Sequence, residues 1–588
     1  MKKMIFNRTG VARVVVTTVL ALFAILPAPA ADDDSDDIIE FLGDRYVIHV
    51  DKMHPDSEMT LLDVLHTCPE FLSENGKTID LNYTLCVDDI DLIMDAESFL
   101  ANVKACEIDY IEISSNSSVA KPVDGTRGVI DVYYREDMKT DGKVALAGST
   151  YGNGMLYTDV TNRSEKLAVQ AYALAHTSYG KAYPTDANRM TDRSLAENVH
   201  VRLDWKISDS DRLLIKAYQT FNNSKMKLFY DDAREEYPFY NRYVGLLFSY
   251  THTFQNESFF VVEMGSDYTS SSDDPIKTGD SYPYGNIEFN TPLFTPDLWL
   301  MVGSEVDYEN LWYKGLKREQ YMLTDFYAQL DYKHGPWVLT LGDRYRMMNF
   351  WNRQYDSEDF SLWKHHRNNH SYLASVGYKA GRHFVQGLFT RRFYIPVISD
   401  FLVDETAPTT SLKYDADSYG TNLAHQAVLR YSYQQRHFFF HSSVESNWYS
   451  NLPGPNQFQI GFRNSVYWKK GPCELTLGAN YYHHHVNYDA DTPSENDNYV
   501  TLKAAPVLLL PEGFRLSSTL LYVSRRSMFD LHPHLFATVK VNKQWGKKCN
   551  IFAEYHDLAG YATGNSLQLS YLDQNRALSL GVTFYPFR

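Results

Sequence analysis

Beyond residue 31, the sequence lacks any run of about 18 consecutive apolar residues, so nothing there is long enough for a transmembrane helix. It has no long Gly/Ser or Pro linker and no repeat with a period of roughly 20–50 residues, which argues against a solenoid or a string of soluble domains. Basic residues are not in excess: the net charge is −17, which disfavours nucleic acid as a partner. The G-x-S-x-G, H-E-x-x-H and P-loop motifs are absent, and we predict that the chain is not an enzyme.

Cysteine is scarce, and the five present are an odd number that cannot form a complete disulfide framework. They are Cys68, Cys86, Cys106, Cys473 and Cys549. A bridge among the first three stays open, because their spacing does not select a pair. The spacing matches no zinc motif, and we predict no metal and no cofactor. The last two lie four predicted strands apart, ~19 Å at ~4.8 Å per strand, which is too far for a disulfide.

The N-terminus has the pattern of a secretory signal peptide. Basic residues between positions 2 and 13 precede an apolar stretch over 14–26 and the small-residue pattern Ala28-Pro29-Ala30. A membrane anchor is the alternative, but about thirteen apolar residues are too few to span a bilayer. We predict a signal peptide over 1–31 and a flexible acidic segment over 32–44.

What the sequence has in abundance is tyrosine and alternation. There are 44 Tyr against 9 Trp, and mean hydropathy is −0.39. From about residue 143 onward, apolar and polar residues alternate, as in the strand Val199-His200-Val201-Arg202-Leu203. A transmembrane β-barrel needs one lipid-facing and one polar face on each strand, with tyrosines at the membrane interfaces. A soluble β-sandwich also alternates, but it does not run to some twenty strands of ~10–14 residues.

Short turns and longer connections alternate along this region. Ten short turns are expected at Asn162–Glu165, Ser208–Asp211, Gln255–Ser258, Thr295–Asp297, His334–Pro336, Ala380–Arg382, Gln434–Arg436, Lys469–Pro472, Pro511–Gly513 and Trp545–Lys548. Longer connections are expected over 180–196, 223–239, 351–368, 396–423 and 559–576. With one opening and one closing strand, the count predicts a barrel of about 22 antiparallel strands over 136–588, short turns on the periplasmic side. A barrel so wide usually needs a plug.

The region before the barrel contains three stretches with a family pattern. Thr60-Leu61-Leu62-Asp63-Val64-Leu65, followed by Pro69, resembles the opening helix of the plug in TonB-dependent outer-membrane receptors. The strand with Ile111 and Glu112 resembles the family's "I-x-x-I-E-V" strand, and Gly125-Thr126-Arg127-Gly128-Val129-Ile130 its "G-x-x-G-V-I" strand. The end of the chain, through Phe587, is similar to that of Bacteroidota-like receptors. The resemblance implies an α+β plug over 45–135 inside the barrel.

The resemblance also implies a cellular setting. It places the chain in the outer membrane of a Gram-negative cell, with outer-membrane lipids, the barrel-assembly machinery, a TonB-type energy-transducing protein, an extracellular ligand and a surface lipoprotein as partners. Ile38, Ile39, Glu40 and Phe41 are the candidate TonB box, and an acidic disordered tip is the alternative. The chain departs from the family where Pro69-Glu70 replaces Pro-Gly and where glycines are missing around 82–91.

Two groups of residues are candidates for ligand binding on the outer side. Tyr230, Tyr237 and Tyr240 could form an aromatic platform in an outer loop, although an interfacial girdle explains them equally well. His365 and His366 in a predicted outer loop and His484 at the top of a strand could bind a transition metal or ligate haem iron, although polar rim residues are the simpler interpretation. His483 and His485 should face away from His484, because neighbouring strand residues point to opposite faces.

Together these features predict an all-β transmembrane barrel with a small α+β plug. By resemblance, its function is to bind an extracellular nutrient, such as an iron chelate, haem, a glycan or a peptide, and to import it into the periplasm. The alternative is a non-transporting binding or scaffold barrel with a degenerate plug. The sequence does not select the ligand.

Overall fold

The computed structural model describes residues 38–42, 45–55, 58–68, 71, 83–87, 90–91, 99–100, 103–115, 128–135, 140–150, 154–179, 191–230, 233–273, 276–313, 317–354, 362–394, 422–435, 437–450, 456–487, 494–527, 533–556 and 577–587. The predicted signal peptide over 1–31 lies outside these residues, as do Pro69 and Gly125 of the plug motifs.

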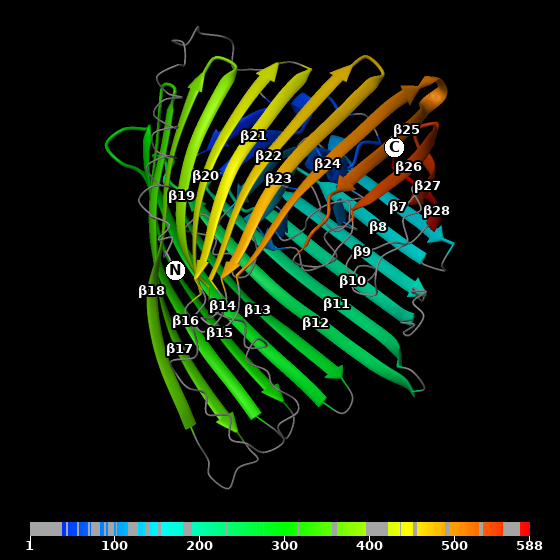
Figure 1. Ribbon diagram of the computed structural model, residues 1–588. Helices are drawn as coiled ribbons and strands as arrows, with labels where there is room; N and C mark the ends of the chain where they lie inside the picture. Colours follow the sequence, from blue (N-terminus) through cyan, green and yellow to red (C-terminus); the bar gives the residue numbers. More distant parts are fainter. Residues whose placement is uncertain are drawn as a thin grey trace, which may run out of the picture.

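The C-terminal part of the chain forms a closed antiparallel barrel of 22 strands, as predicted (Figure 1). Its strands are β7(Thr140–Ser149), β8(Gly154–Arg163), β9(Leu167–Tyr179), β10(Thr191–Lys206), β11(Asp211–Tyr230), β12(Ala233–Thr253), β13(Phe259–Asp273), β14(Ile276–Pro292), β15(Leu298–Tyr313), β16(Lys317–His334), β17(Trp337–Gln354), β18(Leu362–Ala380), β19(His383–Tyr394), β20(Asn422–Gln435), β21(Phe438–Ser450), β22(Asn456–Lys470), β23(Cys473–Asn487), β24(Glu495–Leu510), β25(Phe514–Val523), β26(His534–Trp545), β27(Cys549–His556) and β28(Ala577–Phe584). β28 pairs with β7 and so closes the ring.

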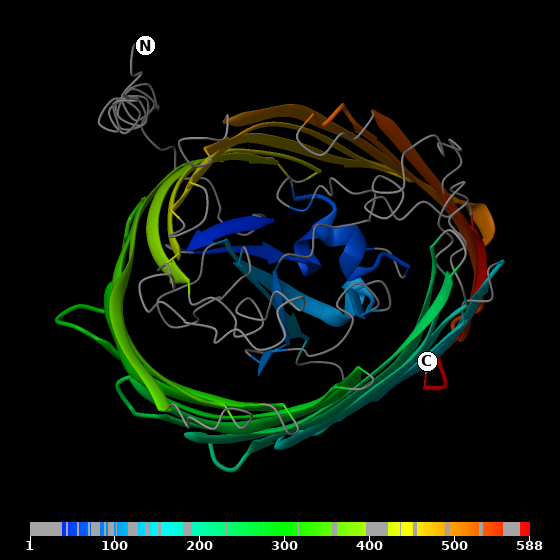
Figure 2. The same ribbon diagram turned by 60° about the horizontal axis from the view of Figure 1, so that its bottom comes forward.

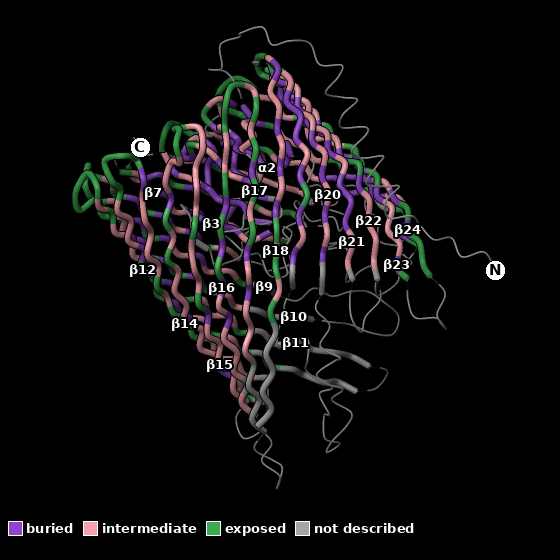
Figure 3. Tube along the Cα trace, turned by 90° about the vertical axis from the view of Figure 1, so that its left-hand side faces the viewer, coloured by how far each residue is buried: buried purple, intermediate pink, exposed green. Residues whose placement is uncertain are grey.

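The predicted alternation is confirmed in the wall of the barrel. On β10, Val199 and Val201 are exposed on the outer face, whereas His200 and Arg202 are buried on the lumenal face. Figure 3 shows this alternation as changes of colour along the strands. Each of the ten predicted short turns falls at a connection between two strands. The period-2 pattern was sufficient here because lipid on one side and a polar lumen on the other demand opposite side chains.

Three predicted long connections are wrong in extent. Strand β10 begins at Thr191, inside the predicted connection 180–196. The segment 223–239 was expected to be a loop, but β11 continues to Tyr230 and β12 begins at Ala233. Likewise β17 runs to Gln354 and β18 begins at Leu362, inside the predicted loop 351–368. With 21 residues, β12 is far longer than the ~9–11 that cross a bilayer. A strand that continues past the bilayer no longer needs one lipid-facing and one polar face, so its sequence need not alternate although the pairing continues.

The N-terminal part forms a separate six-stranded sheet inside the barrel, as Figure 2 shows. Its order is β1-β2-β5-β6-β3-β4. The strands are β1(Ile39–Leu42), β2(Arg45–His49), β3(Thr84–Val87), β4(Ile90–Asp91), β5(Ile108–Ser115) and β6(Gly128–Tyr134), with helix α2(Leu61–Leu65) and the 3-10 helices η2(Asp51–Met53) and η4(Ala105–Glu107). A further 3-10 turn, η6(Pro511–Gly513), joins β24 and β25. We call the described residues before β7, which include β1–β6, α2, η2 and η4, the plug. We call the barrel strands β7–β28 the wall.

The three plug motifs form the elements that the resemblance implied, as far as they are described. Thr60 caps α2 with a capping box: its hydroxyl accepts from the Asp63 backbone N–H, and the Asp63 side chain accepts from the Thr60 backbone N–H. Ile111 and Glu112 lie in β5, and Gly128 opens β6. The plug sheet begins at Ile39, within the segment 32–44 for which the sequence predicted a flexible tail, because the apolar Ile38 and Ile39 are buried in the plug core.

All five cysteines lie among the described residues, and they form no disulfide with one another. Cys473 and Cys549 open β23 and β27, four strands apart, as the sequence predicted. Among the described residues, no helix is long and apolar enough to cross a membrane.

Candidate functional site at the interface of plug and wall

The plug packs into the wall through a shared apolar core. Tyr172, Phe384, Phe439 and Tyr467 of the wall belong to the same buried cluster as the plug's isoleucines and leucines. Phe99 of the plug lies 6.0 Å from Tyr172, centroid to centroid. This apolar packing fixes the plug's position in the barrel. Most of the charged contacts between plug and wall lie elsewhere on the plug.

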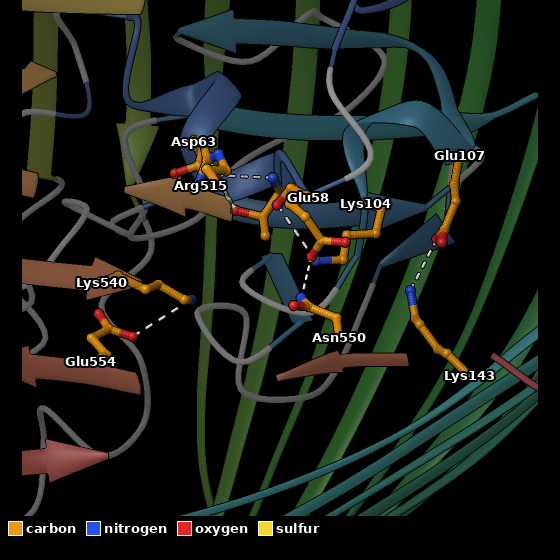
Figure 4. Close-up of polar contacts among 10 residues, drawn as sticks. Glu58, Asp63, Lys104, Glu107, Lys143, Arg515, Lys540, Asn550 and Glu554 are labelled. Carbon is orange, nitrogen blue, oxygen red and sulfur yellow. Dashed lines mark hydrogen bonds and ion pairs between the residues drawn. The ribbon is translucent and has the colours of Figure 1, made fainter. Parts of the chain in front are cut away.

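The most buried of these contacts joins Glu107 of η4 to Lys143 of β7. Their oxygen and nitrogen are 2.9 Å apart, and the two side chains are only 5% and 4% exposed. The Asp159 carboxylate of β8 lies 4.0 Å from the same ammonium. Figure 4 shows Lys143 pointing from the wall toward the plug. A lysine buried between two carboxylates holds the plug strongly, because removal of either partner leaves a buried charge unpaired.

A second buried contact lies beside it. The Lys104 ammonium is 3.0 Å from Glu58, and both residues belong to the plug. Asn550 of β27 donates its amide N–H to the same Glu58 carboxylate (Figure 4). Burial lowers the pKa of Lys104, and the charge of Glu58 opposes that shift. The wall thus contacts the plug through a carboxylate that an internal lysine already neutralises.

Helix α2 provides the third contact. The Arg515 guanidinium of β25 lies 3.3 Å from the Asp63 carboxylate. Burial alone raises the pKa of Asp63, but Arg515 and the Thr60 backbone N–H outweigh it and lower the pKa to about 2. Asp63 therefore stays ionised at neutral pH and serves both as the helix cap and as an anchor to the wall.

These contacts surround a polar cavity of about 250 Å³ between α2 and the wall strands β22–β28. Glu58, Asp63 and His66 line it from the plug, and Lys540 and Glu554, 3.5 Å apart, line it from the wall. At ~30 Å³ per water, such a space holds several water molecules. Polar contacts beside water can exchange partners at a lower free-energy cost than buried apolar packing can be separated.

The edge strand β1 attaches the other side of the plug to the wall. The Gln434 side chain pairs with the backbone of Ile39, accepting its N–H at 2.8 Å and donating to its carbonyl at 2.5 Å. Glu40 contacts His49 at 3.3 Å and Lys333 at 2.9 Å. These partners, His49 first, lower the pKa of Glu40 to about 2. The candidate TonB box therefore begins with two buried residues, Ile38 and Ile39, and continues into edge strand β1, whose open edge is capped by one wall side chain.

A further charged cluster lies within the wall itself. Asp325 of β16 is buried between Arg344 and Arg346 of β17, accepting from Arg344 Nε at 2.7 Å and from Arg346 Nε at 2.9 Å. Glu305 of β15 forms an ion pair with Arg344 as well. The cluster joins three strands on the lumenal face and lies within a row of acidic residues there.

The tyrosines predicted as a ligand platform lie on strands rather than in a loop. Tyr230 ends β11 and Tyr237 lies on β12; their side chains are outside the described set. Tyr240 is 37% exposed on the outer face of β12, in phase with Leu246 and Phe248, and its ring contacts Phe221 edge-on. Its position fits the girdle interpretation. A ligand role for the three tyrosines stays a prediction.

The predicted histidines are not brought together with these tyrosines. His365 and His366 lie on β18, where their backbones pair with Phe350 and Asn349, instead of in a loop. His484 lies on β23, half the circumference away from β12. His483 and His485 bond to Asn498 and Asn496 on the opposite face from His484, as the alternation predicted. A common histidine site is not formed, and a ligand role for His365, His366 and His484 stays a prediction.

The contacts between plug and wall were not predicted residue by residue. Their partners are 36 residues apart for Lys143 and Glu107 and 492 apart for Asn550 and Glu58. The sequence did show charged residues, such as Lys143, Arg515 and Lys540, at strand positions whose alternation places them on the lumenal face. That signal marks a lumenal position but does not identify the partner.

Solved structures of other proteins have a similar architecture. No protein-family model and no curated protein matches the sequence. Among solved structures, the ferric-catecholate import receptor Fiu from E. coli K12 matches with a TM-score of 0.68 and 10% identity, over 95% of this chain and 99% of that one. The FrpB iron transporter from Neisseria meningitidis gives 0.68 and 9% over 92% and 99%. The siderophore receptor PirA from Pseudomonas aeruginosa gives 0.66 and 12% over 93% and 100%.

The chain forms a closed antiparallel β-barrel of 22 strands with a plug inside it. More specifically, its plug and its 22 strands together have the fold of TonB-dependent outer-membrane receptors. Sequence identities near a tenth make this a statement about fold.

Proposed function

We propose that the protein is an outer-membrane receptor that binds an extracellular nutrient and imports it into the periplasm past its plug. The observation that carries this proposal is the side of the plug that faces the cavity, where the polar contacts Glu107–Lys143, Glu58–Asn550 and Asp63–Arg515 join the plug to the wall. A plug that served only to seal the barrel would gain more from continuous apolar packing. Ion pairs beside a hydrated cavity suit a plug that must move.

For the nutrient, an iron chelate is the first candidate, ahead of haem, a glycan or a peptide. The support is analogy: the matched structures are described as siderophore receptors or iron transporters. They are receptors and transporters rather than enzymes, which agrees with a non-catalytic role for this chain.

For the energy source, we propose a TonB-type protein acting on β1. An energising partner could add a strand to the open edge of β1, since β1 is the outermost strand of the plug sheet. Gln434 caps that edge through the backbone of Ile39 and would have to release it first. A pull on β1 would then be transmitted to β2 and β5, because β1 pairs with β2 and β2 pairs with β5.

A second candidate function is a surface binding or scaffold barrel that does not transport. The burial of Ile38 and Ile39, each 2% exposed, favours it, because a docking segment hidden in the plug core cannot be reached from the periplasm. The two candidates differ in whether uptake needs the N-terminal segment and the proton gradient.

An uptake assay in whole cells distinguishes these candidates. Mass spectrometry of small molecules that co-purify with the protein identifies the ligand. In the uptake assay, radiolabelled ferric enterobactin is the first probe. We expect uptake to be lost when residues 32–44 are deleted and when the proton gradient is collapsed. Lys333→Gln is the matched control, because it removes only the solvent-exposed contact to Glu40, which is worth ~0–1 kcal/mol. Binding with no uptake in the wild type, or uptake that survives the deletion, contradicts energised import.

A further inference from the structure

Three oxygen-bearing side chains meet on the lumenal face of neighbouring strands β11, β12 and β13. Tyr243 donates its hydroxyl to Asp267 Oδ2 at 2.7 Å, and Tyr218 donates its hydroxyl to Asp267 Oδ1 in a still shorter contact. Each oxygen of one carboxylate is thus contacted by a different phenol. Tyr218 is 5% and Asp267 8% exposed, and Tyr243 is half-buried.

A glycine makes this convergence possible. Gly245 of β12 pairs with Tyr218 on one side and with Asp267 on the other, so it lies between them. A Cβ at Gly245 would lie 2.1 Å from Tyr218 Cζ and 2.3 Å from Asp267 Oδ1. The Tyr218 ring can therefore cross the middle strand and reach Asp267 only because residue 245 has no side chain.

We propose that Tyr218, Tyr243 and Asp267 form a binding site for ferric iron on the lumenal wall. Carboxylate oxygens suit hard cations, and tyrosine phenolate is a known ligand of iron in proteins. Binding would release the two phenolic protons to solvent, so that two phenolates and one carboxylate together balance the three positive charges of the ion.

The spacing of the oxygens agrees with this chemistry. Oxygen ligands of a small, hard, octahedral cation lie at ~2.0–2.1 Å, so neighbouring ligand oxygens are ~2.9 Å apart. The hydrogen-bonded oxygens of Tyr243 and Asp267 are already close to that separation at 2.7 Å. The ion would replace the shared protons with little movement of the side chains. The remaining coordination positions would be filled from the lumen by water or by donor atoms of a chelator.

The surroundings of the site are aromatic on one side. His200 stacks on Tyr218, with centroids 5.5 Å apart, and Tyr172 stacks on His200 at 4.5 Å. The Lys216 ammonium lies 5.1 Å from the centroid of the Tyr218 ring, over its negative face. This stack fixes the plane of Tyr218 and so directs its hydroxyl at Asp267. The proposal does not depend on import, because binding to the wall needs neither plug movement nor an energising partner.

The test is a titration of the purified full-length protein with ferric iron supplied as its nitrilotriacetate complex. We expect a visible absorption band from phenolate-to-iron charge transfer that saturates at one iron per chain. Tyr218→Phe and Asp267→Asn should each weaken binding by at least ~10–100-fold, the loss usual even for an outer-shell partner of a metal site. Gly245→Ala keeps all three ligands but obstructs Tyr218, so it should reduce the band to a similar degree.

Tyr327→Phe is the matched control. Tyr327 crosses Gly303 in the same manner and donates to Asn286 at 2.9 Å and to Glu288 at 3.0 Å, so its loss removes an equivalent tyrosine away from the site. The band should be unchanged in this variant. A wild-type protein without the band overturns the proposal whether or not the variants fold. So does a band that survives Tyr218→Phe at one iron per chain, or one that Tyr327→Phe abolishes equally.

Discussion

Replacement of Lys143 by methionine should weaken the attachment of the plug by about 3–5 kcal/mol, because it leaves Glu107 charged and buried without its partner. Asp159, 4.0 Å from the same ammonium, would add to the repulsion. Hydrogen exchange measured by mass spectrometry should show faster exchange in β5 and β6, which follow η4 in the chain and lie in the middle of the plug sheet. The wall strands β10–β20 should keep their protection.

Two further variants show whether the effect comes from the buried charge. In Lys143→Met combined with Glu107→Gln, the unpaired plug carboxylate is gone, and part of the lost protection should return. Lys540→Met provides the comparison on the wall: its ion pair with Glu554 is longer, at 3.5 Å, and the two side chains are 30% and 20% exposed. Its loss should cost no more than ~1 kcal/mol. Equal exchange in Lys143→Met and Lys540→Met would mean that the buried pair does not hold the plug.

Replacement of Asp325 by asparagine should destabilise the wall by a similar amount, about 3–5 kcal/mol. The carboxylate is almost fully buried between Arg344 and Arg346, and in its absence both guanidinium groups would lose the anion that they share. Urea unfolding of the protein in phospholipid vesicles measures the change as a lower midpoint. Asp343→Asn is the control on β17, the strand that carries Arg344 and Arg346, because Asp343 and its partner His370 on β18 are 53% and 54% exposed. If both variants shift the midpoint equally, the buried cluster does not stabilise the wall.

The wall was predictable because lipid and water impose opposite demands on alternate residues. Strands such as β10 and the turns at 334–336 and 380–382 could be placed from the sequence alone. The pattern failed where those demands cease. The ends of β11 and β12 lack a clear alternation, so Tyr230 and Tyr237 were assigned to a loop, whereas the backbones of the two strands are paired there.

The plug was predictable in its elements and less so in its extent. The Thr60 capping box and the strand with Ile111 follow from local sequence. Strand β1 was missed although it pairs with the adjacent β2; only its contact with Gln434, 395 residues away, depends on the remote part of the fold. The acidic residues before position 38 suggested a flexible tail that would extend to residue 44.

The polar sites were the least predictable part. Lys143 and Glu107 are each ordinary charged residues in the sequence, and their burial against one another depends on how the plug sits in the barrel. Tyr218, Tyr243 and Asp267 lie on three separate strands, and a glycine on the middle strand allows them to meet. No local motif records such a convergence, since strand register decides which side chains become neighbours.

The conductance of planar lipid bilayers shows whether the 22-stranded barrel is closed by its own plug. The intact protein should insert and remain closed, because the plug packs into the wall and is bound there by ion pairs. The protein without residues 45–135 should form a wide, stable channel, since a barrel of this strand number has an aqueous lumen unless it is filled. Intact protein that conducts as freely as the deletion variant, or a deletion variant that inserts and stays closed, would show that the plug is not what closes the barrel.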